Sequence, residues 1–275
     1  MLTRRRWLTS AMAQATELPE IRSVPADLVT PPMEDGEPAP GRRVKVGESI
    51  YHTLFLPTNW RRGRRYPVIV EYAGNGNYKN QYGDISTGRP EGSCLGYGLS
   101  GGRGYIWLCL PYVDLSANSI AITWWGDATA TVDYCKRVVP AVCEQYGGDP
   151  AKVILTGFSR GAIACNYIGL RDDGIARLWR AFLPYSHYDG VRRWPYADSD
   201  RDSALARLHR LAGRPQFICH ERSIDDTRDY LASTGVQAPF TFEPIRFRNH
   251  NDQWTLRDIP ERRAARRWLA EVLGG

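Results

Sequence analysis

Short apolar runs alternate with amphipathic segments along most of the chain. The runs are too short for typical helices and are expected to be buried strands at 67–74, 105–111, 152–158, 181–186, 216–221 and 242–249. Apolar residues recur at helical spacing in the segments 127–148, 159–170, 201–213 and 259–275. Strands that alternate with helices predict an α/β fold, a mainly parallel central sheet with helices on both faces.

The chain is long enough for one substantial core. With 275 residues, an α/β fold commonly forms a single domain, which we expect over residues 44–275. The stretch "SIYHTLFLP" at 49–57 alternates in polarity and predicts an edge or hairpin strand. Residues 17–43 are rich in Pro, Glu and Gly without periodicity, so the leader 1–43 is expected to lie on the surface or to be disordered.

The first residues bear on localisation. Thr3–Leu8 resembles a twin-arginine signal and Ala11–Ala13 resembles a small-x-small cleavage site. The apolar segment between them is shorter than in usual signals, so export and a cytoplasmic location both stay open. No apolar run approaches the roughly 20 residues that span a bilayer, and we expect no membrane partner.

Charge and cysteine spacing argue against two classes of ligand. The net charge is +6, but the arginines form short, dispersed clusters, whereas phosphate-backbone binding needs basic groups on one face. We therefore expect no nucleic-acid partner. The six cysteines show no C-x-x-C pair and no zinc spacing, so no metal is expected. Cys109, Cys165 and Cys219 lie in apolar stretches and are expected to be buried thiols, and one disulfide stays open for an exported chain.

A serine lies between two glycines where the run 152–158 meets the helical segment 159–170. Gly157-Phe158-Ser159-Arg160-Gly161 matches G-x-S-x-G, a near-chance pattern alone, but here it falls between a strand and a helix. A tight turn at this point needs small flanking residues, and the following helix N-terminus favours negative charge. Ser159 is thus a candidate nucleophile; the alternative is a helix N-cap with packing glycines.

A serine nucleophile needs a base and an acid, and the chain offers both downstream. Asp225 and Asp226 follow the predicted strand 216–221, and His250 follows the predicted strand 242–249. Among the other histidines, His187 follows the predicted strand 181–186 and is better placed to bind substrate. We therefore predict His250 as the base.

The order Ser, Asp, His resembles that of an α/β-hydrolase. The chain is most similar to the esterase group that includes feruloyl esterases, polyhydroxyalkanoate depolymerases and prolyl-oligopeptidase-like hydrolases. The resemblance covers roughly residues 45–273 and rests on "YGGDPAKVILTGFSRGA" and "YHTLFLPTNWRRGRRYPVIVEYAGNG". It implies an α/β-hydrolase fold and a Ser-His-Asp triad.

The acid motif departs from the family pattern. The usual H-G-x-x-D appears as "HERSID" at 220–225, one residue longer and without the glycine. Asp225 begins an Asp-Asp-x-x-x-Tyr run that places Tyr230 where the family has a tyrosine. Asp225 is therefore preferred over Asp226, and Glu221 is a third candidate.

The oxyanion hole is expected from two backbone N–H groups. The resemblance nominates the N–H of Asn75, in the "AGNG" loop, and that of Arg160. As a dinucleotide loop the same stretch lacks its third glycine, which is Lys79, and no phosphate-binding P-loop occurs. No cofactor is expected.

These features predict a serine esterase that works through an acyl-enzyme on small-molecule, carbohydrate or polymer esters. Tyr78, Trp124, Trp125 and His187 are expected at the substrate, where flat rings suit an aromatic acid or a sugar face; each aromatic could instead pack in the core. A prolyl-oligopeptidase-like peptidase and a non-catalytic hydrolase-like binding protein are the alternatives. The sequence indicates no oligomeric state.

Overall fold

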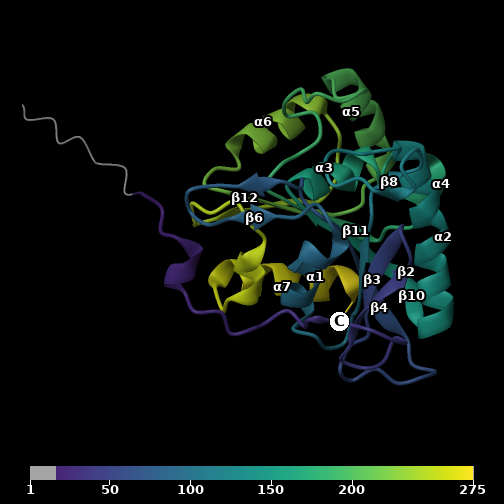
Figure 1. The fold of residues 1–275 in the computed structure, drawn as a ribbon. Helices are drawn as coiled ribbons and strands as arrows, with labels where there is room; N and C mark the ends of the chain where they lie inside the picture. Colours follow the sequence, from purple (N-terminus) through teal and green to yellow (C-terminus); the bar gives the residue numbers. More distant parts are fainter. Residues whose placement is uncertain (1–16, 275) are drawn as a thin grey trace, which may run out of the picture.

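The computed structural model describes residues 17–274 and contains a nine-stranded sheet (Figure 1). β3 is antiparallel to β2 and β7, and all other neighbouring strands are parallel. In spatial order the strands are β1 (Met33–Glu34), β2 (Arg43–Gly47), β3 (Tyr51–Phe55), β7 (Ile106–Leu110), β4 (Tyr66–Tyr72), β10 (Gly148–Phe158), β11 (Ala181–Tyr185), β12 (Gln216–Glu221) and β13 (Phe240–Ile245). Two small hairpins lie outside the sheet: β5 (Tyr78–Lys79) with β6 (Ile85–Ser86), and β8 (Val113–Asp114) with β9 (Ser119–Ile120).

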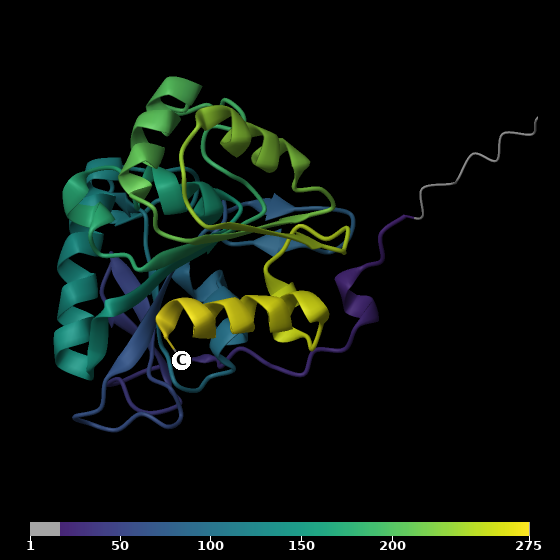
Figure 2. The ribbon, with the colours of Figure 1, turned by 180° about the vertical axis from the view of Figure 1, so that it is seen from behind.

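Helices cover both faces of the sheet, as the views from front and back show (Figures 1 and 2). The α-helices are α1 (Leu95–Ser100), α2 (Ala128–Tyr146), α3 (Arg160–Tyr167), α4 (Asp173–Ala176), α5 (Arg201–Leu208), α6 (Asp225–Thr234) and α7 (Pro260–Leu273). Short 3-10 turns are η1 (Ile21–Ser23), η2 (Pro90–Gly92), η3 (His209–Leu211) and η4 (Gln253–Leu256).

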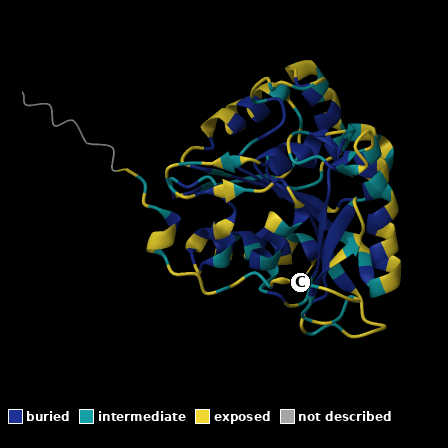
Figure 3. Cartoon of the chain, viewed as in Figure 1, coloured by how far each residue is buried: buried dark blue, intermediate teal, exposed yellow. Residues whose placement is uncertain are grey.

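Side-chain alternation along the strands builds two cores. On β4, Val68 and Val70 pack with α2 and α3, whereas Ile69 packs with α1 and α7. Successive residues of a strand point to opposite faces, so a strand covered on both sides reads as a continuous apolar run. Figure 3 shows the central strands of the sheet buried between the two helical layers.

The expected fold class is confirmed: the sheet is mainly parallel and covered on both faces. Three helices, α1, α4 and α6, were not anticipated. The sequence of α1, "LGYGLS", is poor in strong helix formers, and the buried carboxylate of Glu71 stabilises its start by accepting hydrogen bonds from the N–H groups of Leu95 and Gly96. α6 begins at Asp225, where a loop was expected.

The segment 17–28 lies along the C-terminal part of the chain (Figure 1). Ile21 is buried, and its N–H donates to Asn249 Oδ1 at 2.6 Å. Arg248 contacts Glu20, and Arg262 donates to Asp27. The expected signal within residues 1–16 lies outside the described residues. Among those described, none of the helices has the length and apolar character to cross a bilayer.

Candidate active site

Ser159 sits in a sharp turn between β10 and α3. Its φ of 55° and ψ of −112° lie outside the usual regions for a residue with a side chain, and its N–H donates to the carbonyl of Tyr185. The flanking glycines make the turn fit: a Cβ at Gly157 would approach the Gly161 backbone to 2.3 Å, and one at Gly161 would meet the Tyr72 carbonyl oxygen at 1.9 Å. The turn therefore places Ser159 at the carboxyl edge of the sheet.

Three side chains form a continuous hydrogen-bonded chain at this edge. Ser159 Oγ lies 3.1 Å from His250 Nε2, and His250 Nδ1 lies 2.6 Å from Glu221 Oε1. Ser159 follows β10, Glu221 ends β12, and His250 follows β13 after a short loop. The geometry is that of a nucleophile, a base and the acid that orients the base.

The predicted acid, Asp225, is not part of this arrangement. Its side chain is 70% exposed at the start of α6, where it accepts hydrogen bonds from Arg228 and Ser223. Asp226 is also exposed on that helix. The prediction of Asp225 was wrong because the strand ends at Glu221, whose own carboxylate reaches His250 directly, while the next residues turn away into α6.

Electrostatics favours an ionised Glu221. Burial alone would raise the pKa of this carboxyl, but the hydrogen bond from His250 and the positive potential of His250 and His220 outweigh burial and lower the pKa to about 2. A carboxylate held ionised beside Nδ1 favours the imidazole tautomer with its proton on Nδ1. Nε2, which faces Ser159, is then free to accept a proton.

A cavity of about 190 Å³ opens above Ser159. Its lining includes Asn75, Tyr78, Trp124 and His187 from the predicted site, together with Phe158 and Trp194. Trp125 does not line the cavity. It is 4% exposed and stacks on Tyr167 with ring centroids 4.5 Å apart, so it is a core residue rather than a substrate contact.

Asn75 and Arg160 stand where the oxyanion donors were expected, because both line the cavity beside Ser159. Within residues 17–274 neither N–H donates to a protein acceptor. The Asn75 side chain accepts from the Trp124 N–H at 2.8 Å, which ties the two loops together. The two backbone N–H groups therefore have no acceptor among the described residues.

Comparison with solved structures matches this architecture. A thermostable esterase superposes with a TM-score of 0.51 at 14% identity, covering 83% of this chain and 62% of its own. A feruloyl esterase module from Clostridium thermocellum complexed with sinapinate gives a TM-score of 0.51 at 13% identity over 85% of this chain and 92% of the module. Puromycin hydrolase gives 0.57 at 13% identity over 83% of this chain and 38% of its own. The chain has the α/β-hydrolase fold.

No family model matches the sequence, and no curated protein matches it. The chain spans less than two thirds of the length of the thermostable esterase and of puromycin hydrolase. At these identities the likeness concerns the fold.

A further hydroxyl lies beside His250 and Glu221. Ser186, directly after β11, donates to Glu221 Oε1 at 3.0 Å and lies 3.1 Å from His250 Nδ1. It is fully buried and has a φ of 92°, an unusual conformation for a serine. Nothing in the sequence around Ser186 marked it, since neither its neighbours nor its spacing differ from those of an ordinary strand end.

A buried carboxylate holds the loop that carries His250. Asp84, between β5 and β6, accepts from the His250 N–H at 2.8 Å, from Asn249 Nδ2 at 2.7 Å and from Asn251 Nδ2. Asn80 donates to it as well. Asp84 therefore holds the Asn-His-Asn segment in place. The asparagines on both sides of His250 are the part of this arrangement that is visible in the sequence.

The Arg160 side chain is buried below the cavity rather than at its rim. Its guanidinium donates to the carbonyls of Gly74, Gly88, Ala121 and Trp124 and lies 3.8 Å from the ring centre of Tyr112. Burial lowers its pKa to about 10. The side chain thus joins the loop that carries Asn75 to the loop that carries Trp124.

The site contains no set of metal ligands within the described part of the chain. His187, His220 and His250 approach one another, with ring centroids 5.8 Å apart for His187 and His220 and 5.4 Å apart for His187 and His250. All six cysteines are buried and unpaired.

Proposed function

We propose that this α/β-hydrolase is a serine hydrolase that cleaves carboxylic esters through an acyl-enzyme. The observation that carries the proposal is the chain of contacts from Ser159 Oγ to His250 Nε2 and from His250 Nδ1 to Glu221. A serine hydroxyl alone is a weak nucleophile, and a base oriented by an acid is what activates it.

In the proposed reaction His250 removes the Ser159 proton while Oγ attacks the ester carbonyl carbon. The N–H groups of Asn75 and Arg160 receive the resulting oxyanion. The carbon–oxygen bond to the alcohol then breaks, and the proton on His250 passes to the departing alcohol oxygen. Water, deprotonated by His250, attacks the acyl-enzyme and releases the acid and Ser159. Glu221 stabilises the imidazolium formed in each half.

The cavity walls favour an ester with a flat acyl group. Tyr78, Phe158, Trp124 and Trp194 line the space above Ser159, and offset or edge contacts with such rings stabilise an aromatic acid. The similar feruloyl esterase module was solved with sinapinate, an aromatic acid. We therefore propose aromatic-acid esters, including those of carbohydrates, as the substrate class.

The nucleophile is tested with a fluorophosphonate probe on the wild type and on Ser159→Ala. Labelling of the wild type alone supports the proposal, and equal labelling contradicts it. A panel of 4-nitrophenyl acetate, ethyl ferulate and an aminoacyl 4-nitroanilide then separates esterase from peptidase activity. Faster cleavage of the anilide than of the esters would reassign the chain to the peptidase class.

A further inference from the structure

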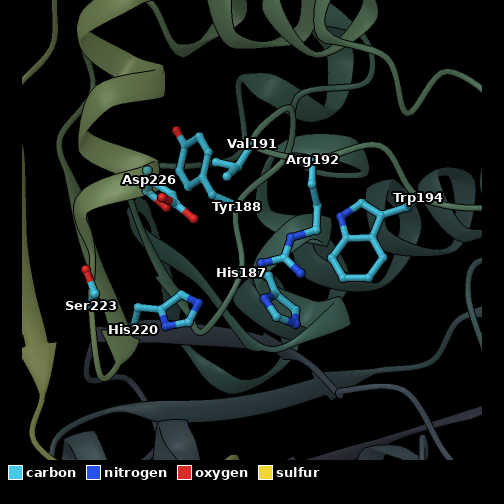
Figure 4. Close-up of a pocket in the computed structure, with 9 residues that line it drawn as sticks. His187, Tyr188, Val191, Arg192, Trp194, His220, Ser223 and Asp226 are labelled. Atoms are coloured by element: carbon cyan, nitrogen blue, oxygen red, sulfur yellow. The ribbon is translucent and has the colours of Figure 1, made fainter.

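A second, smaller pocket lies next to the catalytic cavity. It has a volume of about 110 Å³ and shares His187 and Trp194 with the cavity above Ser159. Figure 4 shows Arg192 and Trp194 on one side of this pocket and His220, Ser223 and Asp226 on the other. A ligand bound at Ser159 can therefore extend past His187 into the side pocket.

The side pocket lies on the leaving-group side of the reaction. The departing oxygen must come within hydrogen-bond reach of His250 Nε2, which supplies its proton. Neither of the proposed oxyanion donors, Asn75 and Arg160, lines the side pocket. His187 has its ring centroid 5.4 Å from that of His250 and is shared with the side pocket. The alcohol portion of an ester thus leaves toward this pocket.

His187 offers polar atoms there that the protein does not use. Within residues 17–274 its ring nitrogens have no hydrogen-bond partner; its contacts are ring contacts with Trp194, His220 and His250. Burial, and then the positive potential of His250, lowers the pKa of His187 to about 3. The neutral imidazole can donate one hydrogen bond and accept another, as a hydroxyl group also can.

The charged groups of the pocket are likewise without ion-pair partners among the described residues. Arg192 lies 5.4 Å from the ring centre of Trp194 and forms no salt bridge, and Asp226 forms none either, although its neighbour Asp225 does. The Arg192 guanidinium can donate hydrogen bonds from one side of the pocket, and the Asp226 carboxylate can accept them on the other. Adjacent hydroxyl groups both donate and accept, so they can bind to both residues. Arg192 and Asp226 are both exposed to water, and an alkyl group that displaces this water from the pocket does not replace its hydrogen bonds.

Building on the function proposed above, we infer that the side pocket of His187, Arg192, His220 and Asp226 binds a hydroxylated alcohol, such as a glyceryl or sugar group, as the leaving group of the ester. The flat acyl group occupies the cavity above Ser159, and Trp194 stands between the two parts of the substrate.

The test compares esters that share one acyl group. The n-propyl, glyceryl and methyl-glucoside esters of 4-hydroxycinnamic acid differ only in the alcohol, and propyl matches glyceryl in chain length. We expect the wild type to favour the hydroxylated alcohols over propyl in kcat/KM by about tenfold or more, because an alkyl group does not replace the hydrogen bonds of the water that it displaces. The glyceryl and glucoside arms show whether a small polyol or a sugar fits better.

The variants are Asp226→Asn and Arg192→Gln, with Asp225→Asn as the matched control on the same helix turn. Each pocket variant should lower the ratio of kcat/KM for the glyceryl ester to that for the propyl ester by about fivefold or more, and the control should keep the wild-type ratio. Equal ratios in all four proteins overturn the inference, as does a response to changes in the acyl group instead of the alcohol.

The outcomes also separate this inference from the proposed function. A chain that is labelled at Ser159 and cleaves propyl and glyceryl esters equally well retains the proposed function and loses the side-pocket inference. A chain that is neither labelled at Ser159 nor active on any ester overturns both.

Discussion

Glu221 Oε1 lies 2.6 Å from His250 Nδ1, and the same oxygen accepts the hydroxyl of Ser186 at 3.0 Å. The carboxylate thus has two donors on one oxygen, and both belong to residues that follow parallel strands of the same sheet edge. Its position at the last residue of β12, rather than in the helix beyond, determines how the base is held.

Replacing this carboxylate should cost most of the activity. Glu221→Gln should lower kcat by about 10³-fold or more, since loss of the orienting acid leaves the imidazole in the wrong tautomer. Steady-state kinetics on ethyl ferulate measures the change. Asp225→Asn is the matched control and should stay within about twofold of wild type because it removes only an exposed ion pair. A larger loss in Asp225→Asn than in Glu221→Gln would restore Asp225 as the acid.

Ser186 should act as a positioning residue for His250. Ser186→Ala removes the hydroxyl that contacts both Glu221 and His250 and should lower kcat about 3- to 10-fold with little change in KM, the expected cost of one buried hydrogen bond of about 1 kcal/mol. The acidic limb of the kcat/KM profile against pH should also move, because the donor to Glu221 is gone. A profile that keeps the wild-type midpoint would reduce Ser186 to a packing role.

The Asp84 clamp should affect kcat through the loop of His250. Asp84→Asn puts an amide donor opposite the donors of Asn249, Asn251 and the His250 N–H, so we expect kcat to fall about 10-fold or more while KM changes less. The rate of fluorophosphonate labelling should fall in parallel. Asp114→Asn, in the other small hairpin, is the control; equal effects of the two variants would argue against the clamp.

The Arg160 side chain should stabilise the folded protein and, with it, the loops that carry Asn75 and Trp124. Arg160→Lys keeps the backbone N–H but cannot reach four carbonyls, and the stranded acceptors should reduce the free energy of unfolding by about 3 kcal/mol. Urea unfolding measures this, and kcat should fall because the loops that carry Asn75 and Trp124 then lose the bridge through the guanidinium and keep only the direct Asn75–Trp124 hydrogen bond. Arg228→Lys, at an exposed ion pair, should change neither; full kcat in Arg160→Lys would contradict the coupling.

Stability should depend on His52 below neutral pH. Burial, and then the charge of Arg137, lowers the pKa of His52 from 6.5 to about 4. The unfolded chain therefore takes up the proton first, so the stabilisation is complete above pH 6.5 and is lost as the pH falls toward 4, at most about 3 kcal/mol.

Urea unfolding at pH 7, 5.5 and 4.5 checks the sign. His52→Gln should flatten the loss of stability over this range, and His209→Gln, at an exposed histidine, should leave it as in the wild type. If the free energy of unfolding falls equally with pH in the wild type and in His52→Gln, His52 is not the cause of the pH dependence.

The elbow could be predicted because its requirements are local. The turn at Ser159 depends on the glycines two residues away. A Cβ at Gly157 would meet the Gly161 backbone within the same five residues, whereas one at Gly161 would meet Tyr72 on the neighbouring strand β4. The mainly parallel sheet and the position of His250 after a strand follow from the alternation of strands and helices in the sequence.

Glu221, Ser186 and Asp84 depend on relations that the sequence does not display. Whether Glu221 or Asp225 meets His250 is decided by where β12 ends, and an end point can shift by a few residues without any change in the apolar pattern. Ser186 and Asp84 reach the His250 region through tertiary contacts between segments far apart in the chain.

Residues 17–28 pack against the loop that carries His250, so cleavage within this segment should affect the position of the base. Ile21 binds Asn249, Asn249 binds Asp84, and Asp84 holds the His250 N–H. A proteolytic cut before Glu17 leaves this relay whole, whereas a cut after Leu28 removes its first member and exposes the loop on that side. The position of any maturation cleavage, tag or fusion junction at this end therefore bears on catalysis as well as on solubility.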